Sequence, residues 1–202
     1  MKEAKILLKD VVKTYKDQTV MFSIKYLELS QNLYFFTGQN GIGKSVFLRS
    51  ICGIETFEEG TMKVNGEKIL YLTDKSVGFN YLTVIENIEL IHKLHGVVLN
   101  TENLTHIYGK KQLNVLARNA SLGMQMKIGC SLLFIKDHWD IIVLDETLAN
   151  IDKESRDIFY DLLDKRTSEG TCAIVVTHNE LPSSNNLSYT KITMNKEGIS
   201  IV

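Results

Sequence analysis

Residues 38–45 read Gly-Gln-Asn-Gly-Ile-Gly-Lys-Ser and match the pattern G-x-x-x-x-G-K-[ST]. Residues 33–37 before them, Leu-Tyr-Phe-Phe-Thr, are typical of a buried strand, and residues 46–52 after them carry apolar side chains at helical spacing. This is the context in which the pattern binds phosphate, because glycine lets successive backbone N–H groups point inward and the helix adds the positive end of its dipole. The stretch therefore predicts an α/β core that holds a phosphate group.

Two polar side chains of this loop suit a nucleoside triphosphate with its magnesium ion. Lys44 places a compact positive charge near the β- and γ-phosphates, and the Ser45 hydroxyl is a ligand for Mg²⁺. Chance gives the pattern in roughly one chain in a hundred of this length, so a plain glycine-rich turn is the weaker interpretation. The residues expected to contact the nucleotide here are Gly38, Asn40, Gly41, Gly43, Lys44, Ser45 and Val46.

Composition narrows the class of protein. The chain has 202 residues, 44% of them hydrophobic, and a formal net charge of −1. This length suits one domain, residues 1–202, and the charge argues against a general nucleic-acid surface. No apolar run reaches the length of a membrane span, the first residues show no signal-peptide pattern, and the three cysteines lack metal or redox spacing. We expect a cytoplasmic protein with buried free thiols.

Apolar runs and turn signals divide the chain into strands and helices. Strands are predicted at 5–8, 20–24, 140–144 and 171–177, hairpins at 61–72 (around Asn65-Gly66) and 191–202, and helices at 83–95 (opened by a Thr83/Glu86 capping box), 124–135 and 153–168. Because strands alternate with helices, we predict an α/β fold: a P-loop core with a mostly parallel sheet and an N-terminal antiparallel β part. Residues 78–122 are strand-poor and predict a small helical insert.

Two further strands end in polar side chains. Residues 141–146 read Ile-Ile-Val-Leu-Asp-Glu, so Asp145 and Glu146 follow a buried strand whose end opens at the ligand crevice. Asp145 is placed to hold Mg²⁺, and Glu146 to deprotonate the water that attacks the γ-phosphate. Residues 173–178 repeat the pattern and deliver His178, which can hydrogen-bond the γ-phosphate. Without the phosphate loop, each would be an ordinary strand end with a solvated polar residue.

The phosphate loop, the insert, the Asp-Glu strand and the His strand, in this order, resemble the ABC-type ATPase family over nearly the whole chain. Residues 120–127, Ala-Ser-Leu-Gly-Met-Gln-Met-Lys, align with the family signature L-S-G-G-Q-x-x-R. The resemblance implies that Ser121 and Gly123 of one copy cap the γ-phosphate bound by a second copy. It places Asp152 in the loop that contacts that second copy. Ser121 and Asp152 are equally suited to cap the helices that follow them.

Two weaker matches complete the predicted site. Asp74 stands where the family has the glutamine of the Q-loop, and a carboxylate there can still reach Mg²⁺ or the water. Tyr15 lies where the family has an aromatic residue that stacks on adenine, although an ordinary strand tyrosine is the alternative.

The resemblance implies an ATP-hydrolysing subunit, with ATP and Mg²⁺ bound, that works as a homo- or heterodimer and drives a separate transmembrane permease. It would then lie at the inner face of the cell membrane, with no nucleic acid bound. The relaxed signature Ser-Leu-Gly-Met looks like that of export-type members. Two alternatives stay open: a soluble ABC-type ATPase acting on a macromolecule, and a degenerate cassette that binds ATP but hardly hydrolyses it.

Overall fold

The computed structural model describes residues 4–177, 187–195 and 198–201. The strands are β1 (Ala4–Thr14), β2 (Val20–Ser30), β3 (Leu33–Gly38), β4 (Glu59–Val64), β5 (Ile69–Leu72), β6 (Ile141–Asp145), β7 (Cys172–Val176), β8 (Thr190–Asn195) and β9 (Gly198–Ile201). The α-helices are α1 (Lys44–Ile51), α2 (Val84–Leu94), α3 (Lys110–Leu113), α4 (Leu122–Cys130) and α5 (Lys153–Ser168), and the 3₁₀ helices are η1 (Thr101–His106), η2 (Ala117–Asn119) and η3 (Ser131–Phe134).

The strands form two sheets, as the predicted fold class requires. A six-stranded sheet has the order β5-β6-β7-β3-β8-β9 and is parallel except for β9, which pairs antiparallel with β8. A three-stranded antiparallel sheet has the order β2-β1-β4. The predicted α/β fold with an antiparallel N-terminal part is confirmed, and so is the hairpin near the C-terminus.

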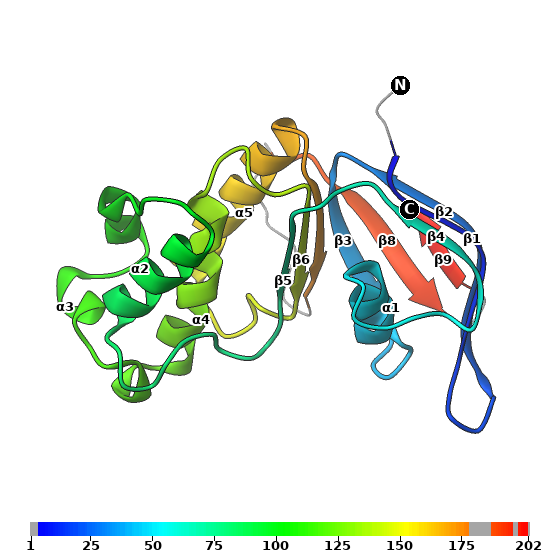
Figure 1. The fold of residues 1–202 in the computed structure, drawn as a ribbon, viewed down its shortest axis with the longest axis horizontal. Coiled ribbons are helices and arrows are strands. Elements are labelled where there is room, and N and C mark those ends of the chain that lie inside the picture. Colours follow the sequence, from blue (N-terminus) through cyan, green and yellow to red (C-terminus); the bar gives the residue numbers. More distant parts are fainter. Residues whose placement is uncertain (1–3, 178–186, 196–197, 202) are drawn as a thin grey trace.

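The strands β6 and β7 inside the six-stranded sheet are buried on both faces, which explains their aliphatic runs. Successive side chains of a strand point to opposite faces, so Phe36 and Val143 pack on one side with α1 and the antiparallel sheet. Phe35 and Leu144 pack on the other side with the helices α2, α4 and α5. Figure 1 shows the antiparallel sheet at one end of the molecule and the helices α2, α3 and α4 at the other.

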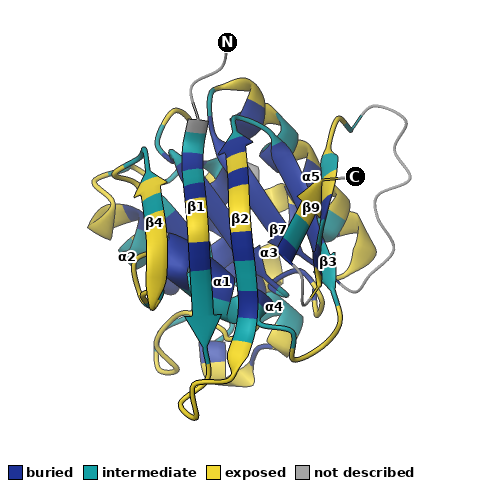
Figure 2. Cartoon of the chain, turned by 90° about the vertical axis from the view of Figure 1, so that its right-hand side faces the viewer, coloured by how far each residue is buried: buried dark blue, intermediate teal, exposed yellow. Residues whose placement is uncertain are grey.

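Strands β1 and β2 extend well beyond the predicted pieces at 5–8 and 20–24. Figure 2 shows buried and exposed residues along both strands. Their alternation changes phase twice: Asp10 adopts φ 51°, and residues 25–26 are both exposed between the buried Ile24 and Leu27. The period-two alternation that indicates a strand ends at such a change, so the predicted pieces cover only the first part of each strand.

The helical elements between β5 and β6 occupy the predicted insert and continue past residue 122 through α4 and η3. The capping box that opens α2 is present: Thr83 Oγ1 accepts from the Glu86 amide at 3.3 Å, and Glu86 Oε2 accepts from the Thr83 amide at 2.7 Å. The short elements η1, α3 and η2 lie within the predicted insert at residues 78–122.

The hairpin predicted at Asn65-Gly66 is wrong. Strand β4 pairs with β1, whereas β5 pairs with β6, so this turn carries the chain from one sheet to the other. Asp140 Oδ2 accepts from the amides of Glu67 at 3.0 Å and Lys68 at 3.2 Å, and a Cβ on Gly66 would lie 2.6 Å from the Asp140 Cβ. Gly66 therefore permits a close approach to Asp140, a tertiary contact that the local pattern does not contain.

The helix predicted at 124–135 begins and ends earlier. Helix α4 runs from Leu122 to Cys130, and the chain then tightens into η3. Two side chains form hydrogen bonds with backbone carbonyl groups where α4 passes into η3. Ser131 Oγ donates to the Ile128 carbonyl at 2.7 Å, and Trp139 Nε1 donates to the Leu132 carbonyl at 3.0 Å. Hydrogen bonds of this kind compete with the regular helix and favour its end.

Candidate functional site

The phosphate loop and the Asp-Glu pair lie at one edge of the six-stranded sheet. Strands β3 and β6 are separated only by β7, and because the three are parallel their carboxyl ends meet at the same edge. A groove of about 410 Å³ opens there. Its lining brings together Asn40, Gly41, Gly43, Lys44, Ser45, Val46 and Glu146, all expected from the sequence, with Met21.

Glycine is required at more than one point of this loop. Gly41 has φ 77° and Gly43 has φ 108°, both in the left-handed region that favours glycine. A Cβ on Gly43 would lie 2.9 Å from the Met21 sulfur and from a ring carbon of Phe22. Gly43 caps α1, which within the described residues has no side-chain cap and no acidic residue in its first turn. The N-terminal amides of α1 are therefore available to an anion.

Lys44 is buried and folds back over its own loop. Its ammonium donates to the carbonyl oxygens of Gly38 at 2.9 Å and Gln39 at 3.0 Å. An ammonium has three donors, so these contacts hold the charge at the mouth of the loop without using its full capacity. The positive charge lies beside the loop backbone and at the groove, which suits a triphosphate.

Asp145 is a buried carboxylate surrounded by other oxygen groups. Burial raises its pKa, a hydrogen bond from Ser45 acts in the opposite direction, and the negative charges of Glu146 and Asp74 raise it further. The Tyr71 hydroxyl donates to Asp145 Oδ2 at 3.4 Å. Tyr71 was not predicted as a site residue. The available signal was a tyrosine, with its polar hydroxyl, in β5, the strand that pairs with β6.

Glu146 is held in an unusual backbone conformation. Its φ is 57°, in the left-handed region, which is uncommon for residues other than glycine. Its amide donates to the Val176 carbonyl at 3.1 Å, and its carbonyl accepts from the Ala149 amide at 3.1 Å. These two backbone hydrogen bonds within the chain hold Glu146 in this conformation. Backbone strain of this kind clusters at functional sites. It turns the chain at the end of β6 so that Glu146 lines the groove.

The oxygen groups at this edge fit a magnesium ion. The Ser45 hydroxyl is close enough to Asp145 to lower the pKa of that carboxyl, and Asp74 is close enough to raise it. Within residues 4–177, 187–195 and 198–201, no three His, Cys, Asp or Glu side chains form a cluster able to hold a metal alone. Mg²⁺ in proteins takes one or two protein groups together with phosphate oxygens and water.

The signature segment, residues 121–123, lies outside the groove of its own chain. Ser121 caps α4, and its hydroxyl accepts from the Met124 amide at 3.3 Å. Asp152 caps α5 by accepting from the Ser155 amide at 2.9 Å. Both residues therefore cap helices in this chain, and their roles toward a second copy stay predictions. Neither residue lines the groove, and nor does Gly123.

The predicted adenine-stacking residue, Tyr15, is not among the residues that form the groove. Tyr15 is 46% exposed in the turn between β1 and β2 and does not line the groove, so its stacking role stays a prediction. His178 lies outside the described residues.

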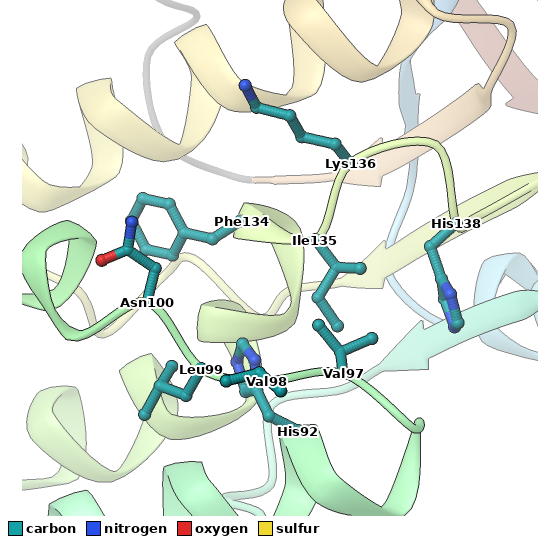
Figure 3. Close-up of a pocket in the computed structure, with 9 residues that line it drawn as sticks. All are labelled: His92, Val97, Val98, Leu99, Asn100, Phe134, Ile135, Lys136 and His138. Atoms are coloured by element: carbon teal, nitrogen blue, oxygen red, sulfur yellow. The ribbon is translucent and has the colours of Figure 1, made fainter.

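A second, smaller hollow of about 230 Å³ lies among the helices (Figure 3). His92 is 2% exposed there, and its Nε2 lies 3.2 Å from Ser131 Oγ. Burial lowers the His92 pKa, which keeps the ring neutral. His92 is therefore a buried residue that packs within the helical part of the structure.

The fold and the groove define a P-loop nucleotide-binding protein of the α/β class. Residues 26–149 match the sequence profile of the family described as ABC transporter. The Cytochrome c biogenesis ATP-binding export protein CcmA of Vibrio vulnificus (strain YJ016) is 26% identical, over 82% of this chain and 88% of its own length. The Uncharacterized ABC transporter ATP-binding protein YybJ of Bacillus subtilis (strain 168) is 26% identical, over 85% and 84%. A solved structure of an ATP binding subunit of an ABC transporter shares the fold, with TM-score 0.76, 16% identity, and 98% and 89% covered.

The chain belongs to the ABC transporter family, as an ATP-binding subunit that hydrolyses ATP. None of the helices in the described ranges combines the length and apolar character that a membrane crossing requires.

Proposed function

We propose that this chain, as a dimer, hydrolyses Mg-ATP to drive a separate membrane permease in the direction of export, at the inner face of the cell membrane. The observation that carries the proposal is the groove in which the 38–45 loop and Glu146 meet. The relaxed signature at residues 121–124 and the relative named as an export protein favour export.

The charged side chains at this site and the Ser45 hydroxyl have distinct parts in phosphoryl transfer, which depends on positioning and charge stabilisation. Lys44 and the loop amides hold the phosphates and stabilise the charge that develops on their oxygens. Ser45 and Asp145 are the groups that would hold Mg²⁺, with Asp74 nearby. When bound, this ion neutralises phosphate charge. Glu146 accepts the proton of the attacking water.

The substitution Glu146→Gln tests the catalytic assignment. It removes the base and keeps the shape, so we expect turnover to fall by about 10²–10⁴-fold while ATP binding persists. Phosphate release at saturating Mg-ATP and equilibrium nucleotide binding are the two measurements. Turnover equal to the unmodified chain would show that another group takes the proton.

The dimer requires the signature segment of one copy to cover the groove of the other. Ser121 and Gly123 at the exposed start of α4 support this role, because helix N-termini bind anions. Phosphate release measured over a range of protein concentrations tests it, and we expect the rate per chain to rise with concentration. A negligible rate at every concentration would favour the degenerate cassette. That alternative is motivated by Leu122 and Met124, which stand where the family signature has a glycine and a glutamine.

An apolar groove between the edge strand β5 and α2 supports a membrane-protein partner. Its volume is about 430 Å³, and its walls include Tyr71, Ile91 and Trp139. At its rim, Leu94 is 74% and Ile54 59% exposed. Exposed apolar side chains gathered at one groove are typical of an interaction site, and we propose that the permease docks here.

The substitution Leu94→Asp tests the docking surface. It should reduce the share of the chain that sediments with membranes of its own cells and leave basal phosphate release unchanged. Ile201→Asp, on an exposed residue of β9, is the matched control. Unchanged sedimentation of Leu94→Asp would contradict docking at this groove. Turnover stimulated by nucleic acid would favour the soluble alternative.

A further inference from the structure

Lys127 is a buried lysine of α4 that the nucleotide groove does not use. Its side chain is 8% exposed. The ammonium donates to the Ile107 carbonyl at 2.9 Å, forms an ion pair with Asp152, and lies 5.6 Å from the centre of the Tyr108 ring. A buried charge is tolerated only with partners of this kind. These contacts therefore fix the position of the ammonium.

Asp152 connects Lys127 to the start of α5. Its Oδ2 takes part in the ion pair and accepts from Ser155 Oγ at 3.1 Å, while its Oδ1 accepts from the Ser155 amide. Desolvation acts to raise the pKa of Asp152, but the hydrogen bonds from Lys127 and Ser155 outweigh it and lower that pKa to about 2. The carboxylate is thus ionised at neutral pH and bound within its own chain.

The backbone makes a second connection at the same place. A Cβ on Gly123 would lie 2.6 Å from the Asn150 carbonyl oxygen, so the first turn of α4 lies directly against the loop that follows Glu146. The Tyr108 hydroxyl donates to the Met124 carbonyl at 2.6 Å. Lys127 is four residues after Gly123 and therefore on the same side of α4.

We propose that Lys127 is a positioning residue, which holds the signature segment (residues 121–123) in a fixed place relative to the loop at 146–152. The inference rests on the proposed function, in which the signature segment completes the nucleotide site of the second copy. In that dimer Glu146 acts on the nucleotide of its own chain, and Ser121 faces the nucleotide of the other. Lys127 thereby connects two half-sites whose alignment sets the rate, since misplacement by about 1 Å costs about 10²-fold.

Three variants of the full chain test the turnover part of this proposal. Lys127→Met keeps the apolar stem and removes the charge, Lys127→Arg keeps a charged donor, and Lys111→Met is a matched control on an exposed lysine of α3. We expect Lys127→Met to lower turnover by about 10- to 100-fold, with Lys127→Arg recovering most of it. The affinity of the monomer for a fluorescent ATP analogue should not change, because Lys127 does not line the groove.

Asp152→Asn tests whether the pair acts as one unit. Asparagine keeps an oxygen that can cap α5 but loses the charge. Adding Asp152→Asn to Lys127→Met should lower turnover no further than Lys127→Met alone, because the interaction is already absent. A multiplicative loss in the double variant would show that the two residues act separately and would overturn the proposal.

Hydrogen exchange tests the connection without any turnover. In Lys127→Met the amides of residues 121–126 and 148–152 should exchange faster together, with those of 38–47 unchanged. Unchanged exchange in both segments would overturn the proposal, and so would a parallel loss of turnover and nucleotide affinity. If the unmodified chain does not hydrolyse ATP, the proposed function fails, and the exchange result still decides whether Lys127 positions the signature segment.

Discussion

At the scale of the single residue, the buried charge of Asp145 lowers the stability of the fold but suits the binding of a metal ion. It is 7% exposed, and its pKa is raised chiefly by burial. Its Ser45 and Tyr71 partners offset only part of that effect. A carboxylate that is disfavoured in its ionised form destabilises the chain at neutral pH. The same charge suits a Mg²⁺ ion, so stability is exchanged here for function.

Replacing this charge should stabilise the chain and abolish its activity. We expect Asp145→Asn to raise the Tm at pH 7.5 by about 2–4 °C, the effect of about 1 kcal/mol in a chain of this size. Mg²⁺-dependent phosphate release should be lost, because Asn offers the ion no charge. Thermal unfolding and phosphate release measure the two effects.

The pH dependence of this gain has a definite sign. Because the folded-state pKa of Asp145 lies above its ordinary value of 3.8, the protonated form is favoured in the folded chain. The unmodified chain therefore loses stability relative to the variant as the pH rises from 3.8 through the folded-state pKa. The Tm difference should shrink as the pH is lowered toward 3.8. A difference that grows at lower pH would contradict the raised pKa.

The phosphate loop shows, at the scale of the element, which glycines the fold needs. Gly41 and Gly43 both have positive φ, but a Cβ on Gly41 meets no atom within 4 Å, whereas one on Gly43 meets Met21 and Phe22 at 2.9 Å. Conformational strain applies to both positions, and overpacking applies only to Gly43.

The two alanine substitutions should differ in stability. We expect Gly41→Ala to lower the free energy of unfolding by about 1 kcal/mol, from strain alone. Gly43→Ala should lower it by about 1–3 kcal/mol more, because Met21 and Phe22 must move. Urea unfolding of both variants gives the comparison. Equal losses would mean that the antiparallel sheet yields freely at Met21, and the packing argument would be wrong.

Elements defined by local chemistry could be predicted from the sequence. The phosphate loop, the α2 capping box and the aliphatic strand before Asp145 are all present, because each depends on residues close together in the chain. The hairpin at Asn65-Gly66 failed because Asp140, far away in sequence, determines that turn. The candidate site follows the same division, since Glu146 was found from its motif, while Tyr71 and Lys127 act through contacts between elements.

At the scale of the whole molecule, the phosphate loop and the signature segment are held in different parts of the structure. The loop joins β3 to α1, whereas Ser121 begins α4 among the helical elements at the other end of the molecule (Figure 1). Ser121 is exposed and does not line the groove of its own chain. If both segments contact one nucleotide, two copies must supply them, and a two-fold dimer gives each copy a part in both sites.

Mixing two inactive variants tests this arrangement. Glu146→Gln lacks the base and keeps the signature segment. Ser121→Glu keeps the base, repels the γ-phosphate of the other copy, and leaves α4 stable because a negative charge suits a helix N-terminus. In a mixed dimer, one site joins Glu146 of the second variant to Ser121 of the first and is intact. Random pairing makes about half of the dimers mixed, so phosphate release should recover to about a quarter of the unmodified rate. No recovery would contradict a site built from two copies whose halves act independently, and substantial activity of Ser121→Glu alone would show that the signature segment does not reach the nucleotide.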